Sequence, residues 1–204
     1  MKPTSHPKLV SDRQIEALRE LINIGVGKGA AILNTMLSSH IVLQVPRLKL
    51  MSMDELADEI ATLNSEKLSM VALKFEGEFS GSAELMFPSE TAMTLVDTLV
   101  GEAPQDMDVD SIRSGTLCEI GNVVLNGVMG SISNIFSSHF NYSVPEYIED
   151  LSENIFLDRG VAPEMTVLLA KTRFLIEKLD VDGDIILFFE FGALDRLIEM
   201  TEGL

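Results

Sequence analysis

Two long segments carry apolar or small residues at the three- and four-residue spacing of an amphipathic helix, from about Asp12 to Ser38 and from about Ser111 to Ser138. In each segment one stripe is suited to a core. The first stripe consists of Ile15, Leu18, Ile22, Gly25, Gly29, Leu33 and Met36. The second consists of Ser114, Leu117, Gly121, Val124, Val128, Ile132 and Ile135. We expect both stripes to face the interior.

The opposite side of each predicted helix is polar or small. It carries Glu16, Glu20, Asn23, Gly27, Ala30, Ala31 and Asn34 in the first helix, and Gly115, Glu119, Asn122, Asn126, Met129, Gly130 and Ser133 in the second. Each side contains a Glu followed three residues later by an Asn, so the two side chains are neighbours on the helix surface. The small residues beyond them keep the surface flat. We therefore expect exposed strips on which another protein can dock.

Strand-like runs follow each helix. Residues 71–79 alternate apolar and charged side chains, the period of a strand with one solvated face, and residues 166–177 form the matching run. Ser80-Gly81 and Asp182-Gly183 are predicted turns, leading to second strands at 83–87 and 185–189. Final helices are predicted at 89–100 and 193–200. Small acidic helices are predicted at 52–60 and 148–157, and a short strand is predicted between each long helix and its small helix, which gives three strands in each half.

This order of elements occurs twice because the sequence repeats itself. The string E-x2-N-x22-P begins at Glu20 and again at Glu119, 99 residues later. About 0.03 such strings are expected by chance in a chain of this composition, so two copies indicate an internal duplication.

The predicted fold is α+β. Two halves related by a pseudo-twofold axis share a largely antiparallel six-stranded sheet, with the two long helices exposed on one side. We divide the chain into an N-terminal tail (1–10), a first repeat (11–101), an acidic connection (102–110) and a second repeat (111–204), and expect both repeats to form one compact domain.

Composition excludes several classes of function. The 204 residues include 15 Lys and Arg against 32 Asp and Glu, a net charge of −17, so nucleic acids and anionic membranes are poor partners. The single cysteine, Cys118, excludes an intramolecular disulfide, a zinc ribbon and a CxxC redox centre, and we expect it to be a small buried side chain. No apolar run approaches the length of a membrane span, and we predict a cytoplasmic protein.

Two further patterns have structural explanations. The run from Gly25 to Gly29 lacks the G-x4-G-K-[ST] spacing of a phosphate-binding loop and lies within a predicted helix, so we assign its glycines to close helix packing. His40 and His139 follow the helices, where an imidazole can bond free carbonyls, and no cluster of metal-ligand type accompanies them.

The two Glu–Asn pairs and their distant prolines resemble the signature of the CheC family of chemotaxis CheY-phosphate phosphatases, the CheC/CheX/FliY group of two-component signalling. The resemblance implies hydrolysis of the aspartyl phosphate of a CheY-like response regulator, with no cofactor on this chain and a magnesium ion on the partner. It implies that Asn23 and Asn122 orient the attacking water, while Glu20 and Glu119 bind the regulator's active-site lysine.

The sequence departs from the family pattern at one position. Glu16 and Gly115 stand four residues before the signature glutamates, where the family carries Asp or Ser. The two sites are therefore not expected to be equal. Two other readings stay open: a non-catalytic adaptor that binds a response regulator or a CheD-type receptor deamidase, and a structural module.

Overall fold

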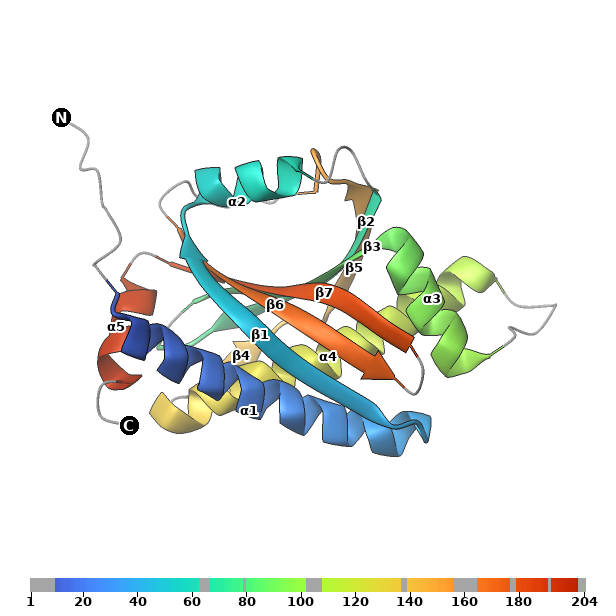
Figure 1. Cartoon of the computed structure of the whole chain (residues 1–204), viewed down its shortest axis with the longest axis horizontal. Helices are drawn as coiled ribbons and strands as arrows, with labels where there is room; N and C mark the ends of the chain where they lie inside the picture. Colours follow the sequence, from blue (N-terminus) through green and yellow to red (C-terminus); the bar gives the residue numbers. More distant parts are fainter. Residues whose placement is uncertain are drawn as a thin grey trace.

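The computed structural model describes residues 10–62, 67–78, 80–101, 108–136, 139–155, 165–176, 179–190 and 192–201 (Figure 1). The tail up to residue 9 and residues 102–107 of the predicted connection lie outside this part. The described elements, in chain order, are α1 (Asp12–Leu37), β1 (Ile41–Met51), α2 (Met53–Ala61), β2 (Lys67–Glu76), β3 (Gly81–Pro88), α3 (Ser89–Val100), α4 (Val109–Phe136), β4 (Asn141–Tyr142), β5 (Glu146–Leu151), β6 (Thr166–Ile176), β7 (Leu179–Phe189) and α5 (Ala193–Thr201).

All described strands join one antiparallel sheet in the order β1-β6-β7-β3-β2-β4, and β5 also pairs with β2. The sheet crosses between the halves: β1 of the first pairs with β6 of the second, while β4 and β5 of the second pair with β2 of the first. When each strand is replaced by its equivalent in the other half, the same order is obtained, read from the opposite edge of the sheet. The predicted α+β class and shared antiparallel sheet are therefore confirmed.

The strand number differs from the prediction for a local reason. Six strands were expected and seven are described, because the position that β1 fills in one half is filled by β4 and β5 in the other. Residues 143–145, which end in Pro145, separate these two strands. Proline has no N–H to donate to a ladder, which favours such a break at an edge.

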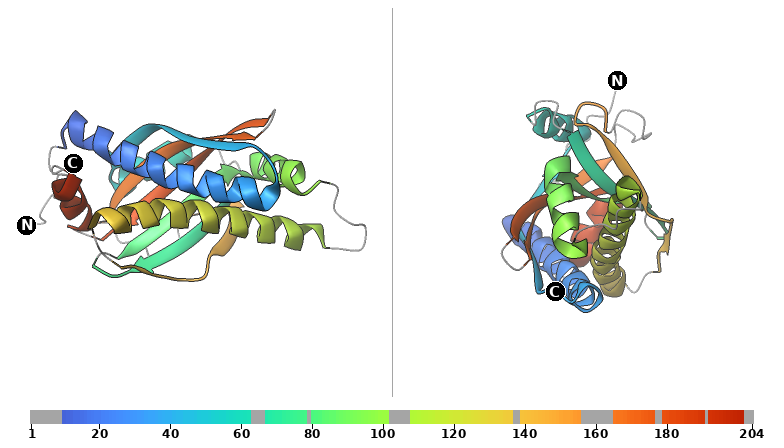
Figure 2. Two further views of the ribbon diagram at one scale, coloured as in Figure 1. Left: turned by 90° about the horizontal axis from the view of Figure 1, so that it is seen from below. Right: turned by 90° about the vertical axis from the view of Figure 1, so that its right-hand side faces the viewer.

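Helices cover the two faces of the sheet unequally. The long helices α1 and α4 lie side by side on one face, and α2 lies on the other (Figures 1 and 2). The larger apolar core fills the space between α1, α4 and the sheet, and includes Leu18, Val124 and Phe75. A smaller core lies under α2 and includes Leu56 and Met70. Both Glu–Asn pairs belong to the helices of the larger layer.

Glycine lets the two long helices approach closely. A Cβ atom on Gly25 would lie 2.5 Å from the Cα atom of Val128, and one on Gly29 would lie 3.1 Å from the Cα atom of Val124. The contacts run in opposite directions along the chain, so the helices are antiparallel. Close helix packing, the role predicted for the glycines of this run, is confirmed for Gly25 and Gly29 and is wrong for Gly27, which has open space around it.

The helix boundaries and faces agree well with the sequence pattern. Helix α1 begins at a capping box, in which Ser11 and Gln14 bond each other's backbone N–H groups. Helix α3 has the predicted bounds. Among the side chains that the structure describes, three were assigned to the wrong face: Ala30 and Met129 are buried in the larger core, and Met36 is 50% exposed. The side chain of Ile135 lies outside the described part. Met36 falls in the last turn of α1, where the stripe has rotated away from the sheet.

The predicted turn at Asp182-Gly183 is wrong. Both residues lie inside β7, where Asp182 pairs with Arg173 and Gly183 with Thr172. A Cβ atom on Gly183 would collide with the ring of Phe87, so this glycine marks a close approach between strands and not a reversal of the chain. The pairing of the two strands ends instead at Ile176 and Leu179, and residues 177 and 178 lie outside the described part.

The small helix predicted at 148–157 is also wrong. Its first residues continue β5, and residues 152–155 form a turn, while 156 and 157 lie outside the described part. Strand β5 pairs with β2 over six residues from each strand. Pairing at this sheet edge outweighs the local helical pattern. The first half does form its predicted helix, α2.

Candidate functional site

The first pair lies on α1, with its two side chains in different surroundings. Glu20 is exposed, and Asn23, one turn further on, is half-buried. Oδ1 of Asn23 accepts a hydrogen bond from the N–H of Val45 at 2.8 Å. Its Nδ2 donates to the carbonyl of Val45 at 3.3 Å and to that of Arg19 at 3.0 Å. The carboxamide therefore pairs with β1 as a neighbouring strand would.

A bulge in β1 explains why Val45 needs this partner. The register with β6 shifts between Gln44 and Arg47, so Val45 and Pro46 have no counterpart in the described pairing. Asn23 takes both backbone groups of Val45, and Arg19 Nη1 donates to the carbonyl of Pro46 at 3.3 Å. The 23-residue spacing from Asn23 to Pro46 is thus the length of chain that connects the asparagine on α1 to the bulge in β1.

The second pair is arranged differently. Glu119 is exposed and Asn122 is half-buried, but Oδ1 of Asn122 accepts from Nδ2 of Asn126, one turn further along α4, at 2.6 Å. Val144, the counterpart of Val45, is 82% exposed. Within the described residues no hydrogen bond joins Asn122 to Val144. The second carboxamide is therefore not tied to the edge strand.

We call the hydrogen bonds from the Asn23 carboxamide to Val45 the latch. Ser143 explains why the second half lacks such a latch. Its N–H donates to the carbonyl of Lys74 at 3.0 Å, and its Oγ accepts from the N–H of Lys74 at 3.0 Å. These bonds fasten the segment before Pro145 to β2 and leave Val144 pointing to solvent. The repeated signature therefore has one geometry in the first half and another in the second.

Charges next to the pairs also differ. Arg19 forms an ion pair with Glu16, and the hydrogen bond and charge of Glu16, with a smaller contribution from Glu20, raise the pKa of Arg19. This arginine offsets the repulsion between Glu16 and Glu20. Next to Glu119, Cys118 is half-buried and not fully buried as expected; burial, then the charge of Glu119, raise the pKa of its thiol.

The pairs lie at separate levels of the helix layer. Since Gly25 is level with Val128 and Gly29 with Val124, Asn122 is level with Ala31, eight residues beyond Asn23. At 1.5 Å per residue the two asparagines are about 12 Å apart along the helix axes. The structure thus brings each Glu to its own Asn and does not bring the two pairs together.

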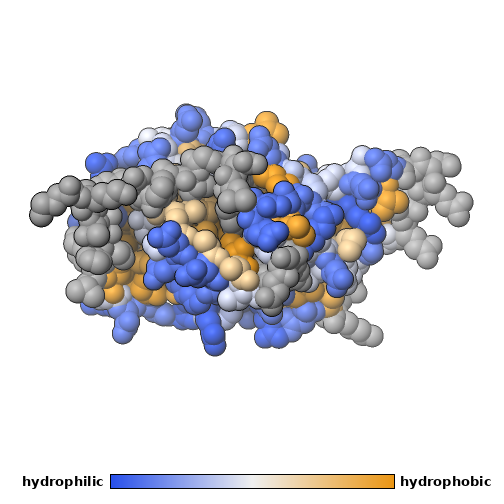
Figure 3. Space-filling view, turned by 90° about the horizontal axis from the view of Figure 1, so that it is seen from above, coloured by the Kyte–Doolittle hydropathy of each residue, from blue (hydrophilic) through white to orange (hydrophobic). Residues whose placement is uncertain are grey.

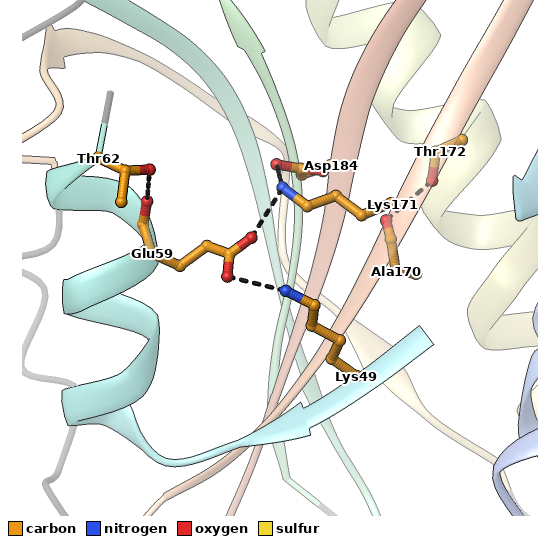
Figure 4. A network of polar contacts seen from close by, with 7 residues as sticks. All are labelled: Lys49, Glu59, Thr62, Ala170, Lys171, Thr172 and Asp184. Atoms are coloured by element: carbon orange, nitrogen blue, oxygen red, sulfur yellow. Dashed lines mark hydrogen bonds and ion pairs between the residues drawn. The ribbon is translucent and has the colours of Figure 1, made fainter. Parts of the chain in front are cut away.

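A separate ion cluster lies at the opposite face of the sheet and was not predicted from the sequence (Figure 4). Glu59 of α2 lies 2.9 Å from Lys49 and 3.6 Å from Lys171, and Lys171 lies 2.9 Å from Asp184. The hydrogen bond from Lys49 leads in lowering the pKa of Glu59, while burial raises that of Asp184. These residues come from four elements, β1, α2, β6 and β7, so no local motif reveals them.

The ion cluster borders a hollow of about 380 Å³ at this face. Seen from the side of α2, hydrophilic residues surround smaller apolar areas (Figure 3). A second hollow, of about 440 Å³, lies between α3, α4, β2 and β5. Neither is lined by Glu20, Asn23, Glu119 or Asn122. The two pairs therefore stand on a helix surface and not in these cavities, as suits contact with a macromolecule.

Two kinds of feature are missing from the described residues. No group of three or more His, Cys, Asp or Glu side chains gathers there as a metal site would require. In the same part of the chain, no helix combines the length and apolar character needed to span a bilayer. His40 and His139 are exposed beyond the ends of α1 and α4.

Comparisons with known proteins agree with this architecture. The profile of the family described as "Chemotaxis phosphatase CheX" matches residues 69–166. The "CheY-P phosphatase CheC" of Bacillus subtilis is 29% identical over 145 residues, which cover 70% of this chain and 69% of that protein. The chain is therefore similar to members of the CheC/CheX/FliY group of CheY-P phosphatases. The resemblance noted in the sequence is thereby confirmed.

Solved structures show that the fold is that of this CheC/CheX/FliY family. FliY from Thermotoga maritima superposes with a TM-score of 0.76 at 17% identity, over 96% of this chain and 99% of the other. CheX in the CheX-CheY-BeF3-Mg²⁺ complex from Borrelia burgdorferi gives a TM-score of 0.51 at 17% identity, over 84% and 99% of the two chains. The roles of the individual Glu and Asn residues stay predictions.

Proposed function

We propose that this chain hydrolyses the aspartyl phosphate of a CheY-like response regulator and that Glu20, Asn23, Glu119 and Asn122 carry the activity. The observation that supports this most directly is the second pair. It combines an exposed carboxylate with a carboxamide whose Nδ2 has no hydrogen-bond partner among the described residues. Both groups are accessible from the face of α4 that a partner would approach.

The chemistry suits these groups. A carboxamide is not a base near neutral pH, but it offers a donor and an acceptor at hydrogen-bonding distance from a water molecule. Phosphoryl transfer has a loose transition state, so orientation of the water in line with the phosphorus supplies much of the acceleration. Asn122 would orient that water, and Glu119 would anchor the helix by binding a lysine beside the phosphoryl group.

The magnesium ion would belong to the regulator. The CheX-CheY-BeF3-Mg²⁺ complex of a relative contains both components, which supports the same arrangement of partner and metal for this chain. The chain would then supply only positioned side chains.

The two pairs would contribute unequally. Asn23 bonds Val45 through both ends of its carboxamide, so it has to release at least one of these bonds before it can hold a water. Asn122 has no such latch. We therefore assign the larger share of the activity to Glu119 and Asn122.

The test is the decay of phosphate from a phosphorylated CheY-like regulator in the presence of the intact protein. We expect accelerated decay with the wild type, a small loss with Asn23→Ala, a large loss with Asn122→Ala, and decay at the regulator's own rate with the double variant. Asn134→Ala is the matched control, since Asn134 is an exposed asparagine of the same helix. Decay that is equal with and without the wild type contradicts the proposal.

The latched state of Asn23 favours a second candidate for the first pair alone. An adaptor surface needs only exposed groups such as Glu20, and it has no use for a free carboxamide. Under this reading the regulator, or a CheD-type protein, binds at α1 without hydrolysis. Binding of the phosphorylated regulator by a variant with both Glu119→Ala and Asn122→Ala, without any acceleration of decay, would support the adaptor reading for the first pair.

A further inference from the structure

We propose that Asn126 is the positioning residue of the second pair: it holds the carboxamide of Asn122 in the orientation that leaves Nδ2 directed to the partner. This inference rests on the proposed phosphatase function and deepens it. The observation behind it is the 2.6 Å hydrogen bond from Nδ2 of Asn126 to Oδ1 of Asn122. The bond spans one turn of α4, and both side chains are half-buried.

The first half shows what this bond replaces. Oδ1 of Asn23 also accepts one hydrogen bond, but its donor is the backbone N–H of Val45. The position equivalent to Asn126 is Gly27, which has open space around it. Each half thus fixes the oxygen of its asparagine by a single donor, from the edge strand in one case and from the same helix in the other.

The free end of the carboxamide differs as a result. Nδ2 of Asn23 donates to two carbonyls, those of Val45 and Arg19. Among the described residues, Nδ2 of Asn122 has no acceptor. Asn126 therefore fixes Asn122 without occupying the group that a water or a phosphoryl oxygen would meet.

Helix stability gives no reason for Asn126. Asparagine in a helix interior is less favourable than alanine by several tenths of a kcal/mol. Its one hydrogen bond within the described structure goes to Asn122. A side chain that is costly for the helix and bonds only a proposed catalytic asparagine is best explained by an effect on that asparagine, because a preset rotamer reduces the entropy lost when the reacting groups come together.

The experiment is done in an Asn23→Ala background, so that only the second pair contributes. We expect Asn126→Ala to lower kcat for the phosphorylated regulator by about fivefold, the effect of losing one neutral hydrogen bond. KM should change by less than about twofold, because Glu119 and the docking surface remain. The midpoint temperature of thermal unfolding should be unchanged or slightly raised, since alanine favours the helix.

Asn126→Asp tests whether the donor matters. The carboxylate has the same size but only accepts hydrogen bonds, so kcat should fall at least as far as with alanine. Asn134→Ala is the control on α4, and Gly27→Asn, which places an asparagine at the same offset in the first half, should not raise activity in the wild-type background. Full activity of either Asn126 variant overturns the proposal, and so does an equal fall with Asn134→Ala.

The failure of the function itself gives a different result. If neither the wild type nor the Asn23→Ala parent accelerates phosphate decay, the proposed function fails and the positioning role fails with it. If the wild type is active and the parent is not, hydrolysis belongs to the first pair. The positioning role and the larger share assigned to Glu119 and Asn122 are then overturned, while the phosphatase activity of the chain stands. The hydrogen bond is read separately from the NMR signals of the Asn126 side-chain amide, which should shift in Asn122→Ala.

Discussion

Asn23 and Asn122 occupy equivalent positions on two helices and make different hydrogen bonds. Asn23 joins two elements, since it bonds the backbone of the bulge in β1. Asn122 bonds a side chain of its own helix. A single residue type therefore has a structural duty in one half that it lacks in the other.

This difference predicts unequal effects on stability. Asn23→Ala leaves the N–H and carbonyl of Val45, a residue that is 2% exposed, without their side-chain partner. We expect a loss of about 1–3 kcal/mol in the free energy of unfolding. Asn122→Ala should change it by less than about 0.5 kcal/mol, because alanine favours the helix. Urea denaturation of both variants measures this, and equal losses would argue against the latch.

Sequence reasoning located the pairs but not these bonds. The positions of Glu20 and Glu119 on exposed helix faces follow from a periodicity of 3.6 residues. The bond from Asn23 to Val45 depends on a bulge, and that bulge arises where β1 pairs with β6, more than 100 residues away. A local pattern carries no information about that register.

At the scale of elements, the contact between α1 and α4 depends on glycine at some positions and not at others. Gly25→Ala would place a methyl group against the backbone of Val128, so the helices would have to separate, and we expect a loss of about 1–3 kcal/mol. Gly27→Ala adds its methyl group in open space and should stabilise α1 by about 0.5–1 kcal/mol. Thermal or urea unfolding distinguishes the two. Destabilisation by both variants would show that the contact is wider than described.

The ion cluster that connects α2 to the sheet predicts a dependence on pH. Lys49 and Lys171 lower the pKa of Glu59 in the folded protein, so its contribution to stability is present above the ordinary Glu pKa and is lost as the pH falls through the lowered value. The difference in free energy of unfolding between the wild type and Glu59→Gln should therefore be largest near pH 7 and disappear under acid conditions.

Urea midpoints measured at several pH values test this, with Asp58→Asn as an exposed control on α2. Asp184 acts in the opposite direction, because burial raises its pKa and protonation relieves the cost of a buried charge. Asp184 is present in both proteins, so the effect of its burial cancels from the difference, and the charge of Glu59 makes only a smaller contribution to the rise in its pKa. A difference that does not change with pH would contradict the assigned role of Glu59.

Element prediction failed where partners in space decided the structure. Asp182-Gly183 has the composition of a hairpin turn, yet both residues lie inside β7. Position 183 is a glycine because the ring of Phe87 fills the space that a side chain would need. Residues 148–151 have a helical pattern but lie at the edge of β2, where strand pairing satisfies their backbone. Helix α3, whose pattern and neighbours agree, was predicted with its observed bounds.

At the scale of the molecule, the exchange of strands between halves predicts cooperative unfolding. In the described sheet β1 is paired only with β6 of the other half. Unfolding of either half would therefore leave a long unpaired strand edge in the half that remains. The chain has no Trp, and its two tyrosines, Tyr142 and Tyr147, are both in the second half. Tyrosine fluorescence therefore reports the strands of the second half that pair with β2 of the first, and far-ultraviolet circular dichroism reports the secondary structure of both halves.

We expect the urea transitions followed by these two signals to coincide, as a two-state process requires. Two separate midpoints would show that one half can persist without the other. The repeat in the sequence predicted the shared sheet and the pseudo-twofold relation, but it could not predict which strands cross over, because a repeat specifies equivalent elements and not their pairing.

The crossing of β1 to β6 and of β5 to β2 has a consequence for how such a protein could arise. A polypeptide with one copy of the motif would have to borrow the missing neighbour from a second molecule, so its folding would depend on its own concentration. Fusion of two copies removes that dependence and ends the obligation of both copies to stay identical. One asparagine could then become a brace for the scaffold while its twin stayed available for chemistry.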